Sequence, residues 1–362
     1  MSPSPRRQTL AEALSARLQA EWLTGGPLST LLLPLSLVYG LVARLRARLL
    51  QPAELPVPVI VVGNWIVGGA GKTPTLLALL EHLKARGLRV GVVSRGYRRE
   101  GDGVELLGPS STAQNAGDEP LLVHLRGRVP VAVGRDRVAA ARALLAAHPE
   151  IQLIVSDDGL QHLRLPRALS VLVFDERGVG NGRLLPAGPL RQAPRWAPAP
   201  DEIVIYNAAR PSTRRAGHLG RRRLRGAVRL QDWWAGRPAE AASLVALRQG
   251  VWTAVAGVAR PQRFFDMLSD LGLHFEPLPQ PDHASYAELP WPASAQGVLL
   301  TEKDAVKIRP ERVGALPVWV LPLDFEPGPE FLAELDTHLN RLLPHGSTPD
   351  RTAGLPPVQG PA

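Results

Sequence analysis

Short apolar runs alternate with longer segments of helical spacing over most of the chain. The apolar runs are bounded by Gly, Pro or charged residues, which is typical of buried strands. They lie at residues 57–62, 90–93, 129–133, 151–155, 169–174 and 202–206. Between them, residues 72–86 and an alanine-rich stretch that ends at His148 have the spacing of helices. Alternating strands and helices predict an α/β domain.

The same alternation restarts at Trp252. Strands are expected at 252–255, 298–300 and 318–321, a helix from Pro261, and a last helix from about Glu330 to Leu343. This pattern predicts a second, smaller α/β domain. The expected organisation is a membrane-associated helical segment at 1–50, a larger domain at 51–225, a linker at 226–250, the smaller domain at 251–344 and a disordered tail at 345–362. Residues 1–9 are also expected to be disordered.

The composition limits the functional classes that need considering. The chain has 362 residues, of which 45% are hydrophobic, and it contains no cysteine, so disulfides and thiolate metal sites are excluded. Its formal net charge is +9, and nearly all of its basic residues are arginine. This balance indicates an anionic partner: a nucleic acid, an acidic lipid or a phosphorylated substrate. The high Ala, Arg and Pro content can equally reflect genomic base composition.

Helical spacing from Leu10 to Leu23 precedes an uncharged stretch at 27–43, which ends in Arg44, Arg46 and Arg48. As a helix, the uncharged stretch would be about 26 Å long, at the short limit for spanning a bilayer. Pro34 and Gly40 weaken a spanning helix. We favour a helix that lies in the membrane interface with its arginines on anionic headgroups. A core helix with a solvated arginine face is the alternative.

A glycine-rich turn joins the first strand to the helix that follows it. It comprises Ile66, Val67, Gly68, Gly69, Ala70, Gly71, Lys72 and Thr73. Its glycines let consecutive backbone N–H groups surround a di- or triphosphate, and the helix N-terminus adds partial positive charge. In such a loop Lys72 reaches the β/γ phosphates and the Thr73 hydroxyl holds Mg²⁺. Ile66 stands where the usual pattern has its first glycine, so a tight turn without a ligand is the alternative.

Acidic residues at the ends of two elements are candidates for the chemistry. Asp157 and Asp158 follow the strand at 151–155, where a phosphate-loop enzyme anchors its Mg²⁺. Both aspartates can bind the metal, or one can bind the metal while the other interacts with the helix that follows. Asp118 opens a helix, where an acidic residue is an ordinary partner of the helix dipole, so catalytic and structural roles both stay open. His162 is more often structural at such a position.

Three further segments are rich in arginine, glycine or proline. Residues 95–99 follow a strand, where their arginines can meet a substrate phosphate or form a solvated basic loop. Residues 175–191 form a long Gly/Pro-rich loop, which is either functional or a linker. The stretch 210–229 is interpreted as a basic connector that faces solvent or membrane.

Several separate motifs together resemble the tetraacyldisaccharide 4′-kinase family of lipid A biosynthesis. In the family's order they are Val62-Gly63-Asn64, Gly68-Gly69-Ala70-Gly71-Lys72-Thr73-Pro74, Ser94-Arg95-Gly96-Tyr97, Gly117-Asp118-Glu119-Pro120, Gly134-Arg135-Asp136-Arg137, Asp157-Asp158-Gly159-Leu160-Gln161-His162, Leu184-Leu185-Pro186-Ala187-Gly188-Pro189-Leu190-Arg191, Ala256-Gly257-Val258-Ala259-Arg260-Pro261-Gln262-Arg263-Phe264-Phe265, Pro281-Asp282-His283 and Thr301-Glu302-Lys303-Asp304-Ala305-Val306-Lys307. They lie between about residues 20 and 325. The family's loop also lacks the usual first glycine, which accounts for Ile66.

The resemblance implies two α/β/α sandwich domains joined by a short β linker, the larger N-terminal one a P-loop nucleoside-triphosphate-binding domain. It implies a kinase that uses ATP and Mg²⁺ to phosphorylate the 4′-hydroxyl of a tetraacylated glucosamine disaccharide 1-phosphate, giving lipid IVA. The family's catalytic carboxylate corresponds to Asp118, its supporting histidine to His283 and its metal-binding pair to Asp157 and Asp158. Lys72 would neutralise the transferred phosphate. After His283 the family often has a second His or another polar residue, whereas this chain has Ala284.

The implied partners are the acylated disaccharide lipid and the lipid surface on the cytoplasmic face of the inner membrane. No nucleic acid is expected, because the stretch 210–229 lacks stacking aromatics and a recognised module, and a monomer is expected. The alternative function is a membrane-attached P-loop ATPase switch of the partitioning type. Such ATPases have a signature lysine where this chain has Val67. A GTPase would need an Asn-Lys-x-Asp motif, which we do not find.

Overall fold

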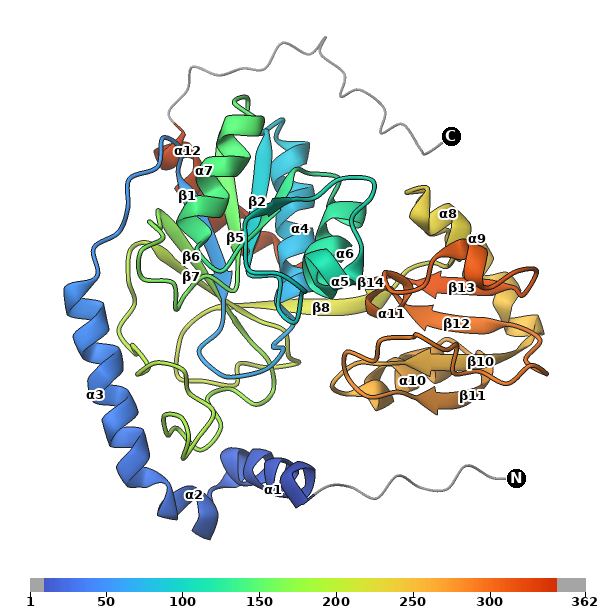
Figure 1. Ribbon diagram of the computed structural model, residues 1–362, viewed down its shortest axis with the longest axis horizontal. Helices are drawn as coiled ribbons and strands as arrows, with labels where there is room; N and C mark the ends of the chain where they lie inside the picture. The colour runs from blue at the N-terminus through green and yellow to red at the C-terminus, as the bar shows by residue number, and fades with distance from the viewer. Residues whose placement is uncertain (1–9, 344–362) are drawn as a thin grey trace.

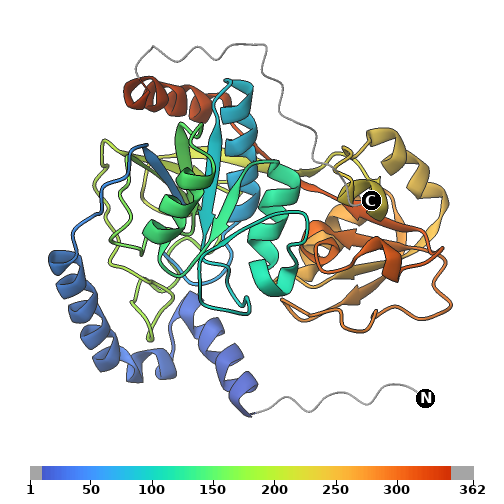
Figure 2. The ribbon, with the colours of Figure 1, turned by 45° about the horizontal axis from the view of Figure 1, so that its top comes forward.

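The computed structural model describes residues 10–343 and contains two β-sheets connected side by side (Figures 1 and 2). The terminal stretches predicted to be disordered, 1–9 and 345–362, lie outside the described residues. The larger sheet has nine strands, in the spatial order β14 (Leu323–Pro327), β8 (His218–Leu224), β7 (Glu202–Tyr206), β6 (Leu169–Phe174), β1 (Val59–Gly63), β5 (Leu153–Asp157), β2 (Val90–Ser94), β4 (Val131–Val133) and β3 (Glu105–Leu106). Its pairs are parallel from β8 to β4 and antiparallel at both edges.

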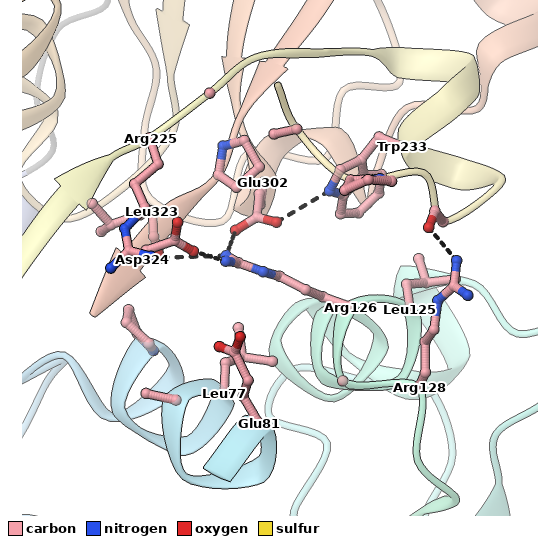
Figure 3. Close-up of a pocket in the computed structure, with 18 of the residues that line it drawn as sticks. Leu77, Glu81, Leu125, Arg126, Arg128, Arg225, Trp233, Glu302, Leu323 and Asp324 are labelled. Carbon is pink, nitrogen blue, oxygen red and sulfur yellow. Dashed lines mark hydrogen bonds and ion pairs between the residues drawn. The ribbon is translucent and has the colours of Figure 1, made fainter. Parts of the chain in front are cut away.

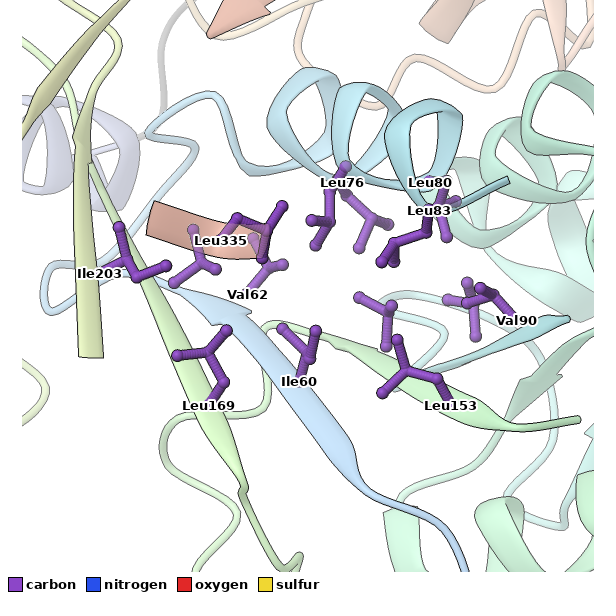
Figure 4. Packing of buried hydrophobic residues seen from close by; sticks show 14 of the residues in the cluster. Ile60, Val62, Leu76, Leu80, Leu83, Val90, Leu153, Leu169, Ile203 and Leu335 are labelled. Carbon is purple, nitrogen blue, oxygen red and sulfur yellow. The ribbon is translucent and has the colours of Figure 1, made fainter. Parts of the chain in front are cut away.

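Helices cover both faces of the larger sheet, so the predicted α/β class is confirmed. They are α4 (Lys72–Ala85), α5 (Ala113–Ala116), α6 (Asp118–Gly127), α7 (Arg137–Ala147) and α12 (Pro329–Leu342). Leucines of α4 and α12 pack on one face, where Leu76, Leu80 and Leu335 meet strand residues such as Ile60 and Val62 (Figure 4). Helix α7 packs on the opposite face. Each buried leucine contributes about 1.5–3 kcal/mol, which explains the unbroken apolar runs in the strands.

The smaller sheet has five strands, in the order β11 (His274–Pro279), β10 (Val251–Ala256), β12 (Val298–Thr301), β13 (Val318–Leu321) and β9 (Val228–Arg229). Only the β13–β9 pair is antiparallel. Its helices are α8 (Leu230–Trp234), α9 (Ala241–Ala246), α10 (Pro261–Asp270) and α11 (Glu302–Ala305), with 3₁₀ turns at Leu247–Gln249 and Pro310–Arg312. The second α/β unit predicted from the restart at Trp252 is therefore present.

The connection between the two sheets differs from the predicted linker at 226–250. Residues 228–234 form β9 and α8 and bury Val228, Leu230 and Trp233 in the core of the smaller domain. The chain instead crosses through β8 on the way out and β14 on the way back, and these strands pair antiparallel at the edge of the larger sheet. Within the predicted basic connector at 210–229, the part that forms β8 is therefore built into a sheet. The sequence pattern missed this because the strand has three consecutive arginines, Arg221, Arg222 and Arg223, in place of an apolar run.

The last helix also differs from its predicted place in the smaller domain. Phe331, Leu335 and Leu339 of α12 are buried with Ile203 and Ile205 of the larger sheet. The chain thus returns to its first domain after completing the second. Helical spacing located this helix but could not say which sheet its apolar face would cover.

Three N-terminal helices lie along one side of the larger domain (Figures 1 and 2). They are α1 (Leu10–Thr24), α2 (Pro27–Leu31) and α3 (Leu33–Leu49). Trp22, Ser36 and Tyr39 donate hydrogen bonds to the backbone carbonyls of Pro186, Leu184 and Arg191, so the helices are attached to the Gly/Pro-rich loop. Among the described residues, no helix is both long and apolar enough to cross a bilayer.

We expect Leu335→Ala to lower the free energy of unfolding by about 2–5 kcal/mol, because it leaves a cavity between α12 and the larger sheet. Thr337→Ala, at an exposed position on the same helix, is the matched control and should change stability by less than about 0.5 kcal/mol. Denaturant unfolding followed by circular dichroism measures both. Equal stabilities of the two variants would contradict the packing of α12 on this domain.

Candidate active site

The glycine-rich turn between β1 and α4 has a backbone conformation that depends on its glycines. Gly68 and Gly71 have φ angles of +87° and +84°, which residues with a side chain rarely adopt. A Cβ atom at Gly71 would lie 1.7 Å from the side-chain nitrogen of Asn207. Ile66 is buried and forms a β-bridge with Leu190, so its side chain anchors the turn in the core. The missing first glycine is therefore a packing position in this fold.

Lys72 and Thr73 open α4 directly behind the turn. The Lys72 ammonium donates a hydrogen bond to the Asn64 side chain at 3.2 Å and lies 3.7 Å from an Asp158 carboxylate oxygen. The Thr73 side chain is half-buried beside it. Arg177 donates to the Gly69 carbonyl at 2.7 Å from the other side of the turn. The turn thus presents a lysine and a hydroxyl at the N-terminus of a long helix, which favours an anion.

Asp157 and Asp158 follow each other at the carboxyl end of β5, but their surroundings differ. Asp157 is buried and accepts a hydrogen bond from Ser94 at 3.0 Å, while its other carboxylate oxygen has no hydrogen-bond partner. Burial, with the negative charges of Glu119 and Asp158, raises the pKa of Asp157 to about 7. A buried carboxylate oxygen without a partner is costly unless a cation or a proton reaches it.

Asp158 already has cationic partners. Arg191 donates two hydrogen bonds to its carboxylate, at 2.7 and 2.8 Å, and Lys72 lies beyond. Burial opposes ionisation, but the charges of Lys72 and Arg191 outweigh it and hold the pKa of Asp158 at about 2. Asp158 has a φ of +49°, a strained backbone conformation for a residue other than glycine.

The donor set at the end of β5 fits a hard cation that needs few protein ligands. Across residues 10–343 there is no group of three or more His, Asp or Glu side chains that could hold a metal by itself. Mg²⁺ commonly takes one or two carboxylates and completes its shell with waters and substrate phosphates. The free oxygen of Asp157 and the Thr73 hydroxyl suit that arrangement, and the anion-favouring turn lies beside them.

Asp118 and His283 form a second cluster that spans the two domains. Asp118 is the first residue of α6, and its carboxylate lies 3.0 Å from His283 Nδ1, in the loop after β11. Burial opposes ionisation of Asp118, but the His283 hydrogen bond and the charges of Lys307 and Lys303 lower the pKa of its carboxyl below the usual value. Like Asp158, His283 has a positive φ, here +62°. The Tyr97 ring packs against the imidazole, with ring centres 5.6 Å apart.

The two clusters are neighbours because of the sheet topology. Parallel strands β1, β2 and β5 end at one edge, which brings together the glycine-rich turn, Ser94 and the two aspartates. A Cβ atom at Gly117, next to Asp118, would lie 3.2 Å from the Cα of Gly96 in the loop after β2, so the start of α6 lies near the same edge. His162, which the sequence analysis read as more often structural, accepts a hydrogen bond from the Arg137 backbone N–H at 3.3 Å.

Arg191 and Lys307 are site residues that the sequence analysis did not single out by chemistry. Arg191 ends the Gly/Pro-rich loop, which the sequence left as functional or a linker. In the structure that loop makes two sets of contacts: its carbonyls accept hydrogen bonds from the N-terminal helices, and its last residue donates to Asp158. The signal for Lys307 was the rarity of lysine in a chain whose basic residues are nearly all arginine.

The chain was compared with known proteins. The family model described as tetraacyldisaccharide-1-P 4′-kinase (LpxK) matches residues 28–340. The chain belongs to the tetraacyldisaccharide 4′-kinase family. Its activity is therefore that of a tetraacyldisaccharide 4′-kinase of lipid A biosynthesis. This confirms the function implied by the resemblance, and the alternative function of a partitioning-type ATPase switch is not supported.

Individual relatives agree with the family model over most of their lengths. A tetraacyldisaccharide 4′-kinase from Methylibium petroleiphilum is 51% identical over 356 residues, which cover 95% of this chain and 99% of the relative. One from Leptothrix cholodnii is 52% identical over 336 residues, covering 90% and 96%. A crystal structure of the "apo" form of LpxK from Aquifex aeolicus in complex with ATP matches with a TM-score of 0.73 at 26% identity, covering 87% of this chain and 99% of that chain.

We expect Asp157→Asn to stabilise the metal-free protein in a pH-dependent way. The pKa of Asp157 is about 7 in the folded chain, against 3.8 for the ordinary carboxyl, so the folded state retains a proton that the unfolded state has lost. The wild type therefore loses stability as pH rises from about 4 to about 7. The variant should be more stable by up to about 4 kcal/mol at pH 8, with no difference near pH 4.

Thermal and denaturant unfolding from pH 4 to pH 8 in metal-free buffer measure this difference. Asp270→Asn, at an exposed position on α10, is the control and should show no such trend. A variant that is no more stable than the wild type at pH 8 would show that the charge on Asp157 is already compensated.

Proposed function

We propose that the larger domain is a P-loop nucleotide-binding domain and that the turn at 66–73 holds the triphosphate of ATP for transfer of the γ-phosphoryl group to the 4′-hydroxyl of the lipid disaccharide 1-phosphate. The observation that carries this proposal is the glycine-rich turn at the start of α4, with Lys72 behind it. The likeness to a structure described as an ATP complex supports it. The Lys72 ammonium, which now contacts Asn64 and Asp158, would turn to the β and γ phosphates.

Asp157 and Thr73 are the proposed ligands of Mg²⁺, with Asp158 beside them. Bound Mg²⁺ would neutralise charge on the phosphates. The unpartnered oxygen of Asp157 supports this assignment. Asp158 is held by Arg191 and Lys72, so its proposed part is to orient these two cations and to support the metal's water shell.

Asp118 is the proposed general base. A sugar hydroxyl is a poor nucleophile, so a carboxylate within hydrogen-bond reach accelerates attack by accepting its proton as the new O–P bond forms. The low pKa of the Asp118 carboxyl keeps it ionised and ready to accept that proton at neutral pH. His283 orients the carboxylate through the Nδ1 contact at 3.0 Å. Because this pair comes from two domains of one chain, a monomer supplies the whole site.

The N-terminal helices are the proposed membrane-binding element, at the cytoplasmic face of the inner membrane. Their apolar side chains are exposed to an unusual degree, with Leu31, Leu37 and Leu49 each more than 70% exposed and Leu35, Val38 and Leu41 more than half exposed. Exposed arginines follow at 44, 46 and 48. An amphipathic helix of this kind rests in the interface and leaves acyl chains in the bilayer while the sugar enters the site. The proposed partners are thus lipids, with no nucleic acid.

We expect Asp118→Asn to lower kcat by about 10² to 10⁴, because an amide cannot accept the hydroxyl proton. The experiment incubates labelled ATP with the tetraacylated disaccharide 1-phosphate, with and without Mg²⁺, and follows label in the lipid. Binding of a fluorescent ATP analogue should survive in Asp118→Asn and be lost in Lys72→Ala. Near-normal turnover of the folded Asp118→Asn protein would refute the assignment of the base.

We expect Leu37→Glu to weaken binding to anionic phospholipid vesicles by about tenfold or more, because it removes about 1.5–3 kcal/mol of apolar burial and adds a repelled charge. Val245→Glu, at a similarly exposed position on α9 of the smaller domain, is the matched control. Co-sedimentation with vesicles measures both. If the two variants sediment alike, α3 is not the membrane-binding surface.

A further inference from the structure

Lysine is rare in this chain, and three of its four positions lie beside candidate site residues. Of the 42 basic residues counted as Lys+Arg, four are lysines: Lys72, Lys84, Lys303 and Lys307. Lys72 lies at the glycine-rich turn, and Lys303 and Lys307 lie beside Asp118 and Glu119. Lysine offers a compact point charge on a flexible stem, whereas arginine offers a wide planar fork. Three of the four lysines, all but Lys84, therefore lie beside candidate site residues, where a compact charge can approach a carboxylate or a phosphate.

Lys303 and Lys307 belong to a segment of the smaller domain that lies along α6. The segment includes α11 and makes three charge pairs with α6. At the far end of α6, Arg126 pairs with Glu302 and with Asp324, beside a cavity of about 400 Å³ between the domains (Figure 3). At the near end, Lys303 lies 3.6 Å from Glu119, and Lys307 lies 3.6 Å from Asp118. The segment therefore sets the position of α6 at both ends.

The ammonium of Lys307 sits in a closed, charged environment. Its side chain is only 4% exposed, and its nitrogen lies 3.5 Å from Asp304 and 5.0 Å above the centre of the Tyr286 ring. Asp304 is fully buried and is fixed by hydrogen bonds from the Gly257 backbone at 3.0 Å and the Thr301 hydroxyl at 2.7 Å. Within the described residues the Lys307 ammonium makes no hydrogen bond, and it lies between Asp304 of the smaller domain and Asp118 of the larger one, at ion-pair distances of 3.5 and 3.6 Å.

We propose that Lys307 is a positioning residue: its ammonium, held by Asp304, fixes the Asp118 carboxylate in its charged form and in the orientation that accepts the substrate proton. This inference rests on the proposed role of Asp118 as the base. Stability alone does not account for the arrangement, because buried ion pairs are often replaced by apolar residues at no cost. Both partners of Asp118, His283 and Lys307, come from the smaller domain, so the base is prepared only when the two domains are docked.

The proposal predicts a direction for the pH dependence. The groups that face Asp118 are His283, Lys303, Lys307 and Tyr286, with Glu119 beside it and Asp282 and Asp304 behind the cations. Burial opposes ionisation of Asp118, and the His283 hydrogen bond and the Lys307 charge are the largest factors that lower its pKa. Removing the Lys307 charge therefore raises the pKa of Asp118. In a plot of kcat/KM against pH, the fall at low pH, called the acid limb below, should then begin at a higher pH than in the wild type.

The test compares Lys307→Met with Lys307→Arg and with the matched control Lys84→Met. Lys84 donates to the Gly127 carbonyl, away from Asp118. Because Lys307→Met leaves Asp304 buried without its cation, the double variant Lys307→Met/Asp304→Asn is included to remove that uncompensated charge. Steady-state kinetics from about pH 3 to pH 9 give kcat, the KM for ATP and the position of the acid limb. Thermal unfolding shows over which part of that range each protein stays folded.

We expect both proteins that lack the Lys307 charge to lose about tenfold or more in kcat, with the KM for ATP changed by less than about twofold and the acid limb moved to higher pH. Lys307→Arg should recover part of kcat and return the limb toward its original pH. Lys84→Met should match the wild type. A purely structural role predicts instead that the stable double variant recovers wild-type kinetics, and this result would overturn the proposal.

A comparison in the Asp118→Asn background separates this inference from the proposed function. There, adding Lys307→Met should no longer move the acid limb, because the group that it tunes is gone. If Asp118→Asn itself retains turnover, the proposed base is wrong. If Asp118→Asn is inactive while Lys307→Met/Asp304→Asn follows the wild-type pH profile, the base stands and only the role of Lys307 is refuted.

Discussion

The site depends on balancing the charges of carboxylates that the fold has partly or wholly removed from water. Asp118, Asp157, Asp158 and Asp304 lie in or near one region, and each isolated buried charge would be costly. Arg191 and Lys72 compensate Asp158, and His283 and Lys307 compensate Asp118. Asp157 and Asp304 each keep one carboxylate oxygen without a hydrogen-bond partner, but that of Asp304 lies 3.5 Å from the Lys307 ammonium. The free oxygen of Asp157 is therefore the better suited of the two to a bound cation.

This balance is shared between parts of the chain that are far apart in sequence. The partners of Asp118 come from the smaller domain, and those of Asp158 come from the start of α4 and from the end of the Gly/Pro-rich loop. Because the partners of a carboxylate in one domain lie in the other domain, the electrostatics of the site depend on how the two domains are docked. Strained backbone at Asp158 and His283 is consistent with positions that the surroundings hold in place.

The Gly/Pro-rich loop connects the exposed N-terminal helices with the nucleotide side of the site. Tyr39 of α3 donates to the backbone carbonyl of Arg191 at 2.7 Å, and the Arg191 side chain holds Asp158 and the carbonyl of Asn64. The surface proposed to rest on lipid is thus attached through one residue to the proposed metal and phosphate region. Under the proposed function, in which the acyl chains of the substrate stay in the bilayer, such attachment would set the distance between the site and the membrane surface.

Much of the local structure follows from the sequence, because local patterns have local causes. The apolar runs became β1, β2, β5, β6 and β7, since strands buried on both faces must be apolar throughout. The glycines at 68 and 71 occupy left-handed backbone conformations, which glycine adopts more readily than any other residue. The pairing of Asp118 with His283 was available only through the family resemblance, because 165 residues separate the two in sequence and no local pattern connects them.

The sequence by itself determined the α/β alternation, the glycine-rich turn at 66–73 between a strand and a helix, the uncharged N-terminal stretch and, through its motifs, the family. Only the tertiary structure decided that 228–234 belongs to the smaller domain, that α12 returns to the larger one, and that Arg191 and Lys307 neutralise particular carboxylates. The physical reason is that amphipathic spacing says which face of an element is buried but not against which partner. A charge likewise acquires its role only when the fold places the opposite charge beside it.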